Sequence, residues 1–182
     1  MAWFFLKNHY TSSQEQGGGI LGDLLLGREI IGAVELEAYP REVLLSRQAD
    51  KILPYFPIWD DVTTFRLDNP ETRQYIEFLQ SIKDDLCICG GFPCQDLSIA
   101  GKQAGLDGER SGLWFEMYRI ICEIRPRNIF VENSPMLTLR GLDRVTGDLS
   151  KVGYDCKWSV IGADDVKAPH QRKRLWLIGN RK

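Results

Sequence analysis

Short apolar runs alternate with amphipathic stretches along almost the whole chain. The apolar runs are bounded by polar or turn-forming residues, which is typical of strands buried in a sheet. They cover residues 3–6, 29–35, 85–89, 128–132, 154–161 and 174–178. Helices are expected between them, over residues 20–26, 40–47, 69–82, 113–124 and 134–152. Because strands and helices alternate, the sequence predicts a Rossmann-like α/β fold with a mostly parallel sheet and helices on both faces.

A turn follows the strand expected at residues 85–89. Gly90 and Gly91, with Pro93 close behind, stop this strand and permit a sharp turn. Cys94 therefore lies at the carboxyl end of a strand, where open α/β sheets bind their ligands. A cysteine there can act as a nucleophile if its surroundings lower the pKa of the thiol. The alternative is that Cys94 is a small buried apolar residue beside a turn.

A second candidate site involves glycines near the start of the chain. Gly17, Gly18 and Gly19 open a Gly-x-Gly-x-x-Gly pattern, although the polar residues 7–16 separate it from the strand before it. Glu35 ends a strand about 20 residues further on, where nucleotide-binding folds place a carboxylate that accepts hydrogen bonds from ribose hydroxyls. The alternative for Glu35 is a solvated charge at a strand end.

Composition limits the class of protein. With 182 residues, of which 43% are hydrophobic and 26% charged, the chain has the size and composition of one globular domain. Its net charge of −2 gives no global sign of nucleic-acid binding, so any such surface must be a local patch. No apolar run approaches the length of a membrane span, and no association with a membrane is expected.

The cysteines indicate the compartment and argue against a metal site. There are five of them, an odd number, and no signal peptide opens the chain, which favours a reduced cytoplasmic compartment over a disulfide framework. Cys87, Cys89 and Cys94 cluster but do not form a Cys-x-x-Cys pair. No metal ligand is therefore expected.

Three motifs in order resemble those of a known family. Residues 91–98, Gly-Phe-Pro-Cys-Gln-Asp-Leu-Ser, resemble the catalytic motif of the DNA cytosine-5 methyltransferases, which is built around Pro-Cys-Gln. Residues 130–134 resemble the Glu-Asn-Val motif of that family, and residues 169–174 its Pro-Gln-x-Arg-x-Arg motif. The order and the approximate spacing of the motifs also agree.

The resemblance implies transfer of a methyl group from S-adenosylmethionine to carbon 5 of cytosine in DNA. Cys94 would add to carbon 6 of the ring, and Glu132 would hydrogen-bond to N3 or protonate it, for which its pKa must be raised. Arg174 is expected to contact the cytosine side of the pocket, and Arg172 the substrate backbone or the two catalytic side chains. A cytosine in a duplex has to flip out to reach such a pocket. The expected substrate-binding residues are Gln95, Ser98 and Asn133.

By the same resemblance, the cofactor site collects residues from several elements. Glu35 takes the ribose-binding place and Leu36 offers apolar contact to the adenine. Asp61 would accept from the exocyclic amine of the adenine, although capping of a loop is the alternative for an Asp in this position. The remaining cofactor residues are the glycines Gly17, Gly18 and Gly19, the backbone of Val62 against the ring, and Leu113 at the start of a helix that lines the site.

The resemblance covers about residues 17–179. Residues 1–182 are expected to form a single catalytic domain without the family's target-recognition region and C-terminal motifs. DNA is the expected partner, together with a second chain if the recognition region is supplied separately, in the cytoplasm of a prokaryote or from a phage. Two alternatives stay open. One is a transfer-RNA cytosine methyltransferase, since relatives with the same motifs modify RNA, and the other is a non-catalytic remnant that binds nucleic acid or a partner chain.

Overall fold

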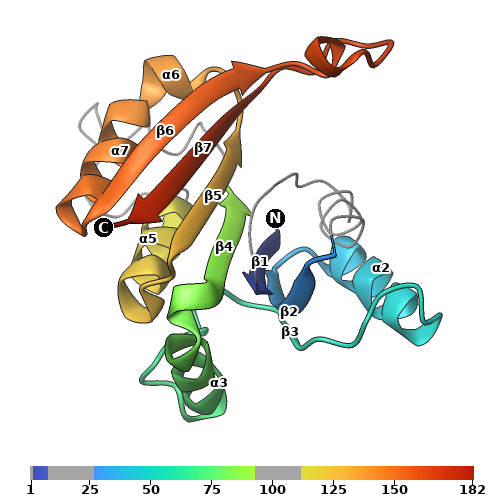
Figure 1. Ribbon diagram of the computed structural model, residues 1–182. Coiled ribbons are helices and arrows are strands. Elements are labelled where there is room, and N and C mark those ends of the chain that lie inside the picture. The colour runs from blue at the N-terminus through green and yellow to red at the C-terminus, as the bar shows by residue number, and fades with distance from the viewer. Residues whose placement is uncertain (1, 8–26, 93–111) are drawn as a thin grey trace.

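A twisted seven-stranded sheet with the strand order β3-β2-β1-β4-β5-β7-β6 forms the centre of the described molecule (Figure 1). The computed structural model describes residues 2–7, 27–92 and 112–182. The strands are β1 (Ala2–Lys7), β2 (Glu29–Glu35), β3 (Ile58–Trp59), β4 (Leu86–Gly91), β5 (Asn128–Asn133), β6 (Tyr154–Ile161) and β7 (Arg174–Arg181). The helices are α2 (Ala38–Ala49), α3 (Pro70–Ser81), α5 (Gly112–Ile124), α6 (Leu137–Arg140) and α7 (Leu142–Lys151), with the short 3-10 helices η1 (Lys83–Asp85) and η2 (Asp164–Val166). Among the described helices, none combines the length and the apolar character that crossing a membrane requires.

Most of the described strands share one direction. β2 is parallel to β3, and β4 is parallel to β5. β1 is antiparallel to both β2 and β4, and β7 is antiparallel to both β5 and β6. β2, β3, β4, β5 and β6 therefore run the same way, and their carboxyl ends meet at one edge, which is the upper edge for β4, β5 and β6 in Figure 1. The predicted fold class, a mostly parallel Rossmann-like sheet, is confirmed.

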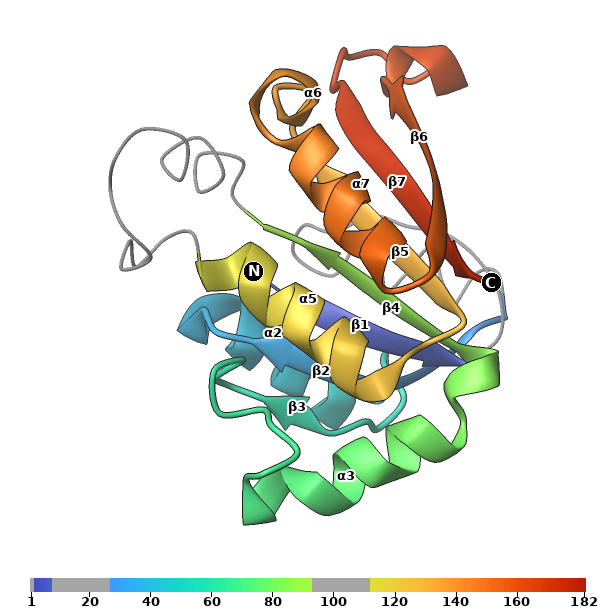
Figure 2. The same ribbon diagram turned by 90° about the vertical axis from the view of Figure 1, so that its left-hand side faces the viewer.

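Helices cover both faces of the sheet, as predicted (Figure 2). α3, α5 and α7 lie on one face, where their apolar side chains pack with those of β4, β5 and β7 into the larger core. α2 lies on the other face, where Leu44 packs with Phe56 and with strand residues in a smaller core. The buried stripe of α5 is nearly inaccessible, since Met117 and Ile121 are 0% exposed and Ile120 is 1% exposed. α5 is therefore packed firmly against this face of the sheet.

The end of β4 differs from the sequence prediction. The strand does not stop before its two glycines, because Gly90 pairs with Val131 and Gly91 pairs with Glu132. Ladder hydrogen bonds use only backbone groups, so glycine continues a strand wherever a neighbour supplies partners. β4 thus ends at Gly91, further along than the apolar pattern indicates.

The helix predicted over residues 134–152 is two helices. α6 ends at Arg140 and α7 begins at Leu142, with Gly141 between them at a φ of +151°. Residues with a side chain rarely adopt that backbone conformation. The apolar period runs through both helices, so the pattern alone did not reveal the break.

β1 enters the sheet in the direction opposite to its neighbours. Ala2 pairs with Glu35, and Lys7 pairs with both Glu29 and Leu86. β1 therefore starts at the carboxyl edge of β2 and ends at the amino edge of β2 and β4. Residues 8–26, which include the predicted glycine loop and the helix expected at 20–26, lie outside the described residues.

Candidate active site

The carboxyl ends of β4 and β5 lie side by side because the two strands are parallel neighbours. Gly91, the last residue of β4, pairs with Glu132 near the end of β5. The chain then leaves β4 through Phe92, which is 3% exposed. Backbone pairing thus places Glu132 beside the strand end that leads into the Cys94 turn. The predicted catalytic and substrate residues outside the described part of the chain are Cys94, Gln95 and Ser98.

Glu132 forms an ion pair with Arg174 at the start of β7. The Arg174 Nε lies 2.7 Å from the Glu132 Oε1, and the two side chains are 26% and 15% exposed. β7 is antiparallel to β5 and pairs Trp176 with Glu132, which brings Arg174 level with the end of β5. Burial raises the pKa of the Glu132 carboxyl above its ordinary value, while the charge and hydrogen bond of Arg174 work in the opposite direction. Glu132 is therefore a partly buried carboxyl with a raised pKa, and the Arg174 guanidinium holds it in place.

Asn133 fixes the chain where it leaves β4. Its Nδ2 donates to the Phe92 carbonyl oxygen at 2.7 Å, and its Oδ1 accepts from the Ser134 N–H at 2.8 Å. The Phe92 ring packs against Trp114 of α5, with 5.2 Å between ring centroids. Asn133 is 3% exposed, so these bonds lie away from water. The amide expected to bind substrate thus holds Phe92, where the chain leaves β4, and its contact with substrate stays a prediction.

Glu35 ends β2 as a buried carboxylate. It is 3% exposed, and its Oε1 accepts from the Glu37 N–H at 2.9 Å. Arg41 Nη1 donates to the Glu35 and Leu36 carbonyl oxygens, each at 3.1 Å, which fixes the turn between β2 and α2. The Leu36 side chain is 51% exposed beside it, as an apolar contact for a ligand ring requires. Both residues thus lie at the edge where the ribose and adenine were expected.

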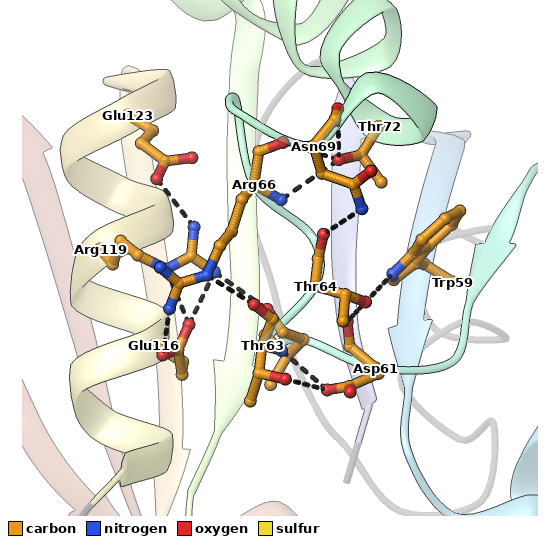
Figure 3. Close-up of polar contacts among 11 residues, drawn as sticks. Trp59, Asp61, Thr63, Thr64, Arg66, Asn69, Thr72, Glu116, Arg119 and Glu123 are labelled. Atoms are coloured by element: carbon orange, nitrogen blue, oxygen red, sulfur yellow. Dashed lines mark hydrogen bonds and ion pairs between the residues drawn. The ribbon is translucent and has the colours of Figure 1, made fainter.

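Asp61 closes a tight turn after β3. Its Oδ1 accepts from the Thr63 N–H at 2.8 Å and from the Thr63 hydroxyl at 2.7 Å (Figure 3). The capping alternative considered for Asp61 is therefore present in the structure. Within the described residues both of these hydrogen bonds use Oδ1, so capping does not occupy Oδ2. Val62 beside it is 4% exposed, and its carbonyl oxygen accepts from the guanidinium of Arg119 at 2.9 Å.

The structure also describes two further predicted site residues, Leu113 and Arg172. Leu113, the second residue of α5, is partly buried and packs against the larger core. Arg172 is exposed in the segment between η2 and β7, two residues before Arg174. Gly17, Gly18 and Gly19 lie outside the described residues. The roles of all five stay predictions.

A group of charged residues that the sequence analysis did not identify supports the Asp61 turn. Glu116, Arg119 and Glu123 follow one another on α5 at spacings of three and four residues, and Arg66 approaches from the turn itself (Figure 3). The spacing of the three helical residues is a signal for ion pairs along one helix face. Nothing in the sequence shows that this face lies against the turn, because that depends on how α5 packs.

Comparison with known proteins shows the family to which this chain is similar. A sequence model of the family described as C-5 cytosine-specific DNA methylase matches residues 64–182. The type II methyltransferase M.CviJI of Paramecium bursaria Chlorella virus IL3A is 37% identical over 127 residues, which are 69% of this chain and 31% of that protein. The type II methyltransferase M.HhaI of Haemophilus parahaemolyticus is 33% identical over 103 residues, 54% of this chain and 32% of that protein. The chain spans about a third of the length of these curated relatives.

Solved structures share the fold. The Dnmt2 methyltransferase of S. pombe superimposes with a TM-score of 0.63 at 14% identity, over 84% of this chain and 43% of that one. A putative DNA modification methyltransferase encoded within an E. coli prophage gives a TM-score of 0.58 at 24% identity, over 84% of this chain and 40% of that one. At these identities the likeness shows the fold alone.

Proposed function

The chain belongs to the C-5 cytosine-specific DNA methylase family, and from this premise we propose that it transfers a methyl group from S-adenosylmethionine to carbon 5 of cytosine in DNA. The observation that carries the proposal is the partly buried Glu132–Arg174 pair opposite Gly91. It places a carboxyl of raised pKa beside the strand end that leads into Cys94. The reaction needs a thiolate and a proton donor on one small ring, and in this proposal Cys94 supplies the first and Glu132 the second.

In the proposed mechanism, Cys94 forms the covalent bond to the ring and Glu132 stabilises the charge that results. The Cys94 Sγ forms a bond to carbon 6, and the electrons of the C5–C6 double bond move through the ring toward N3. Glu132 donates a hydrogen bond or its proton at N3, which stabilises that charge. Carbon 5 is then nucleophilic and would take the methyl group as the bond between that methyl and the sulfur of the donor breaks, with S-adenosylhomocysteine as the leaving group, and a proton given to N3 returns to Glu132. Loss of the C5 proton to a base restores the double bond, and the Sγ–C6 bond breaks.

Arg174 and Asn133 prepare this chemistry without reacting. Arg174 holds the Glu132 carboxyl in one orientation through the 2.7 Å contact, and limits how far burial raises its pKa. Asn133 holds the Phe92 carbonyl at 2.7 Å and so fixes the chain entering the Cys94 turn. Fixed orientation of both reacting groups lowers the entropy lost on reaching the transition state. We propose that Arg172 contacts the DNA backbone, and that Gln95 and Ser98 contact the flipped cytosine or its strand.

The described residues fit the adenosine half of the methyl donor, which supplies an electrophilic methyl group when bound. We propose that Glu35 accepts from the ribose hydroxyls, that Leu36 packs against the adenine, and that Asp61 Oδ2 accepts from the exocyclic amine. The support is a 3% exposed carboxylate, an exposed apolar side chain and a carboxylate oxygen that capping leaves unused, all at the carboxyl edge. Val62 and Leu113 border the same site, and Gly17, Gly18 and Gly19 are proposed for the methionine side. The comparisons give no support to a second chain, and we propose none.

Covalent trapping tests the proposal. In DNA that carries 5-fluorocytosine, carbon 5 has no proton to lose after methylation, so the Sγ–C6 bond persists. The 182-residue chain is incubated with S-adenosylmethionine and a library of such duplexes that covers all short sequence contexts. We expect an adduct that survives denaturation, with the modified cytosine mapped to Cys94 by mass spectrometry of the peptides.

Matched variants separate catalysis from adventitious thiol chemistry. Cys94→Ser should abolish the adduct, and Cys156→Ser, which changes a half-buried cysteine of β6, should leave it intact. An adduct that maps to another cysteine would contradict the mechanism. DNA binding without any adduct in the wild-type chain would instead favour the non-catalytic alternative.

A further inference from the structure

Glu116 of α5 joins two arginines that come from different parts of the chain. Its Oε1 lies 3.1 Å from the Arg66 Nη2, and its Oε2 lies 2.7 Å from the Arg119 Nη2 (Figure 3). Arg119 also pairs with Glu123 one turn further on, with 2.8 Å between Nη1 and Oε1. The side chains of Glu116, Arg119 and Glu123 are only 16–23% exposed, so these pairs are screened less than surface pairs. Two positive and two negative charges make the group neutral as a whole.

Both arginines also hold the backbone of the Asp61 turn. The Arg119 Nη2 donates to the Val62 carbonyl oxygen at 2.9 Å, and the Arg66 Nε donates to the Thr63 carbonyl oxygen at 2.5 Å. Two successive carbonyl oxygens of the turn are thus bound by guanidinium groups that share one carboxylate. The turn is anchored to α5, whose buried face is part of the larger core.

The anchored backbone sets the direction of the Asp61 carboxylate. The Asp61 carbonyl oxygen accepts from the N–H groups of Thr64 and Phe65, each at 3.2 Å. The Asp61 Oδ1 accepts from Thr63, so the side chain cannot rotate without breaking bonds to the residue whose carbonyl Arg66 holds. The Val62 carbonyl and the Thr63 N–H belong to the same peptide unit. A movement of that carbonyl therefore also moves the N–H that binds the Asp61 Oδ1.

We propose that Arg119 is a positioning residue for the adenine half of the cofactor site, because it fixes the Val62 carbonyl and through it the direction of the Asp61 carboxylate. This role rests on the proposed function, in which Asp61 receives the adenine amine. Arg119 does not touch the ligand. Its effect is preorganisation, since a carboxylate already aimed at the amine loses less entropy on binding.

Arginine suits this role better than lysine. Its planar fork donates to the Val62 carbonyl, Glu116 and Glu123 from fixed directions at once. A single ammonium group cannot span these three acceptors. Arg119→Lys therefore keeps the charge that neutralises the two glutamates and should retain the fold, but it should hold the turn less firmly.

Hydrogen exchange of the chain without any ligand gives the first test. The amides of Thr64 and Phe65 are bonded to the Asp61 carbonyl and report on the turn. In Arg119→Gln and in Arg119→Lys we expect exchange at these amides to rise about tenfold or more, the factor that corresponds to losing a hydrogen bond to a charged group. Exchange at Val131 in β5 should not change. Unaltered exchange at Thr64 and Phe65 would overturn the proposal.

The second test measures recognition of the adenine amine. Calorimetry gives the Kd values of S-adenosylhomocysteine and of S-inosylhomocysteine, which has a carbonyl in place of the amine. The wild-type chain should prefer the adenosyl ligand, and this preference should fall about tenfold in Arg119→Lys, since the aimed carboxylate is what discriminates. Arg73→Gln is the matched control, because Arg73 also donates to a loop carbonyl, that of Leu67 at 3.1 Å, but beyond the Asp61 turn. It should keep the full preference.

The outcomes distinguish the two proposals. Equal weakening of both ligands in Arg119→Lys, with the preference unchanged, would mean a general structural role and would overturn the positioning role alone. A wild-type chain that shows no preference for the adenosyl ligand would contradict the assignment of Asp61 and, with it, the role of Arg119. If Arg119→Gln does not fold, Arg119→Lys carries both tests.

Discussion

The Glu132 carboxyl is under two opposing influences at the end of β5. Burial disfavours its charged form and raises its pKa, whereas Arg174 at 2.7 Å favours the charged form, and burial is the larger of the two. The carboxyl therefore keeps its proton to a higher pH than an ordinary glutamate does. For a group proposed to act as an acid at N3, this balance extends the pH range in which it carries the required proton.

The raised pKa predicts how stability depends on pH. The folded state binds the Glu132 proton more tightly than the unfolded state, so the stabilisation is complete below pH 4.5, the ordinary value, and is lost as the pH rises through the raised pKa. Glu132→Gln has no proton to lose there. The free energy of unfolding of the wild type, relative to this variant, should therefore decrease from pH 4.5 upward, as measured by urea denaturation at a series of pH values.

An exposed glutamate gives the control for that measurement. Glu77→Gln changes a solvent-facing residue of α3, so its stability relative to wild type should vary little over the same range. A wild-type stability that rises relative to Glu132→Gln with increasing pH would mean that Arg174 outweighs burial and that the pKa of the Glu132 carboxyl is lowered.

At the scale of single elements, the glycines at positions 141 and 147 have opposite structural roles. Gly141 separates α6 from α7 at a φ of +151°, whereas Gly147 lies inside α7, where an added Cβ would meet nothing within 4 Å. A side chain at the first position forces a backbone conformation that L-residues avoid. At the second position a side chain only reduces the freedom of the unfolded chain.

We expect opposite effects of the same substitution at these positions. Gly141→Ala should destabilise the fold by about 1–2 kcal/mol, the usual strain of a disfavoured backbone conformation. Gly147→Ala should stabilise it by about 0.5–1 kcal/mol, the difference between the two residues inside a helix. Chemical denaturation of both variants measures the pair. Stabilisation by both substitutions to the same extent would indicate one continuous helix with no special backbone at Gly141.

At the scale of the whole molecule, the sheet is unevenly protected. Ile88 and Val131 in the adjacent strands β4 and β5 are 0% exposed, and helices of the larger core cover one face of these strands. β6 lies at the edge of the sheet, pairs only with β7 among the described strands, and is exposed from Trp158 to Ile161. The local free energy of opening should therefore fall from the middle of the sheet to the β6 edge.

Native-state hydrogen exchange tests this gradient. The paired amides of β4 and β5 should exchange about a hundredfold or more slowly than those of the outer half of β6, since opening free energies range from near zero in exposed elements to the global value in the core. Uniform protection across all strands would contradict the gradient. Slowest exchange in β6 would mean that another surface covers that edge.

The sequence determined the family and most of the elements. Apolar periodicity is a local property, so the strands 29–35 and 154–161 were placed at their observed bounds and the helix at 69–82 was found within one or two residues. The motifs around Cys94 and Glu132 were sufficient to identify the family, which the comparison over residues 64–182 confirmed. Local pattern and residue type decide these features, because each depends on neighbours in the chain.

The tertiary structure decided which groups meet and in what direction the chain runs between them. The Glu132–Arg174 pair joins residues 42 positions apart through the register of β5 and β7, and Arg119 reaches the Val62 carbonyl from 57 positions away. The opposite direction of β1, and the continuation of β4 through its glycines, likewise follow from pairing with neighbouring strands. Hydrogen bonds and ion pairs between distant segments depend on register and packing, which no local pattern encodes, and these contacts define the geometry of the candidate site.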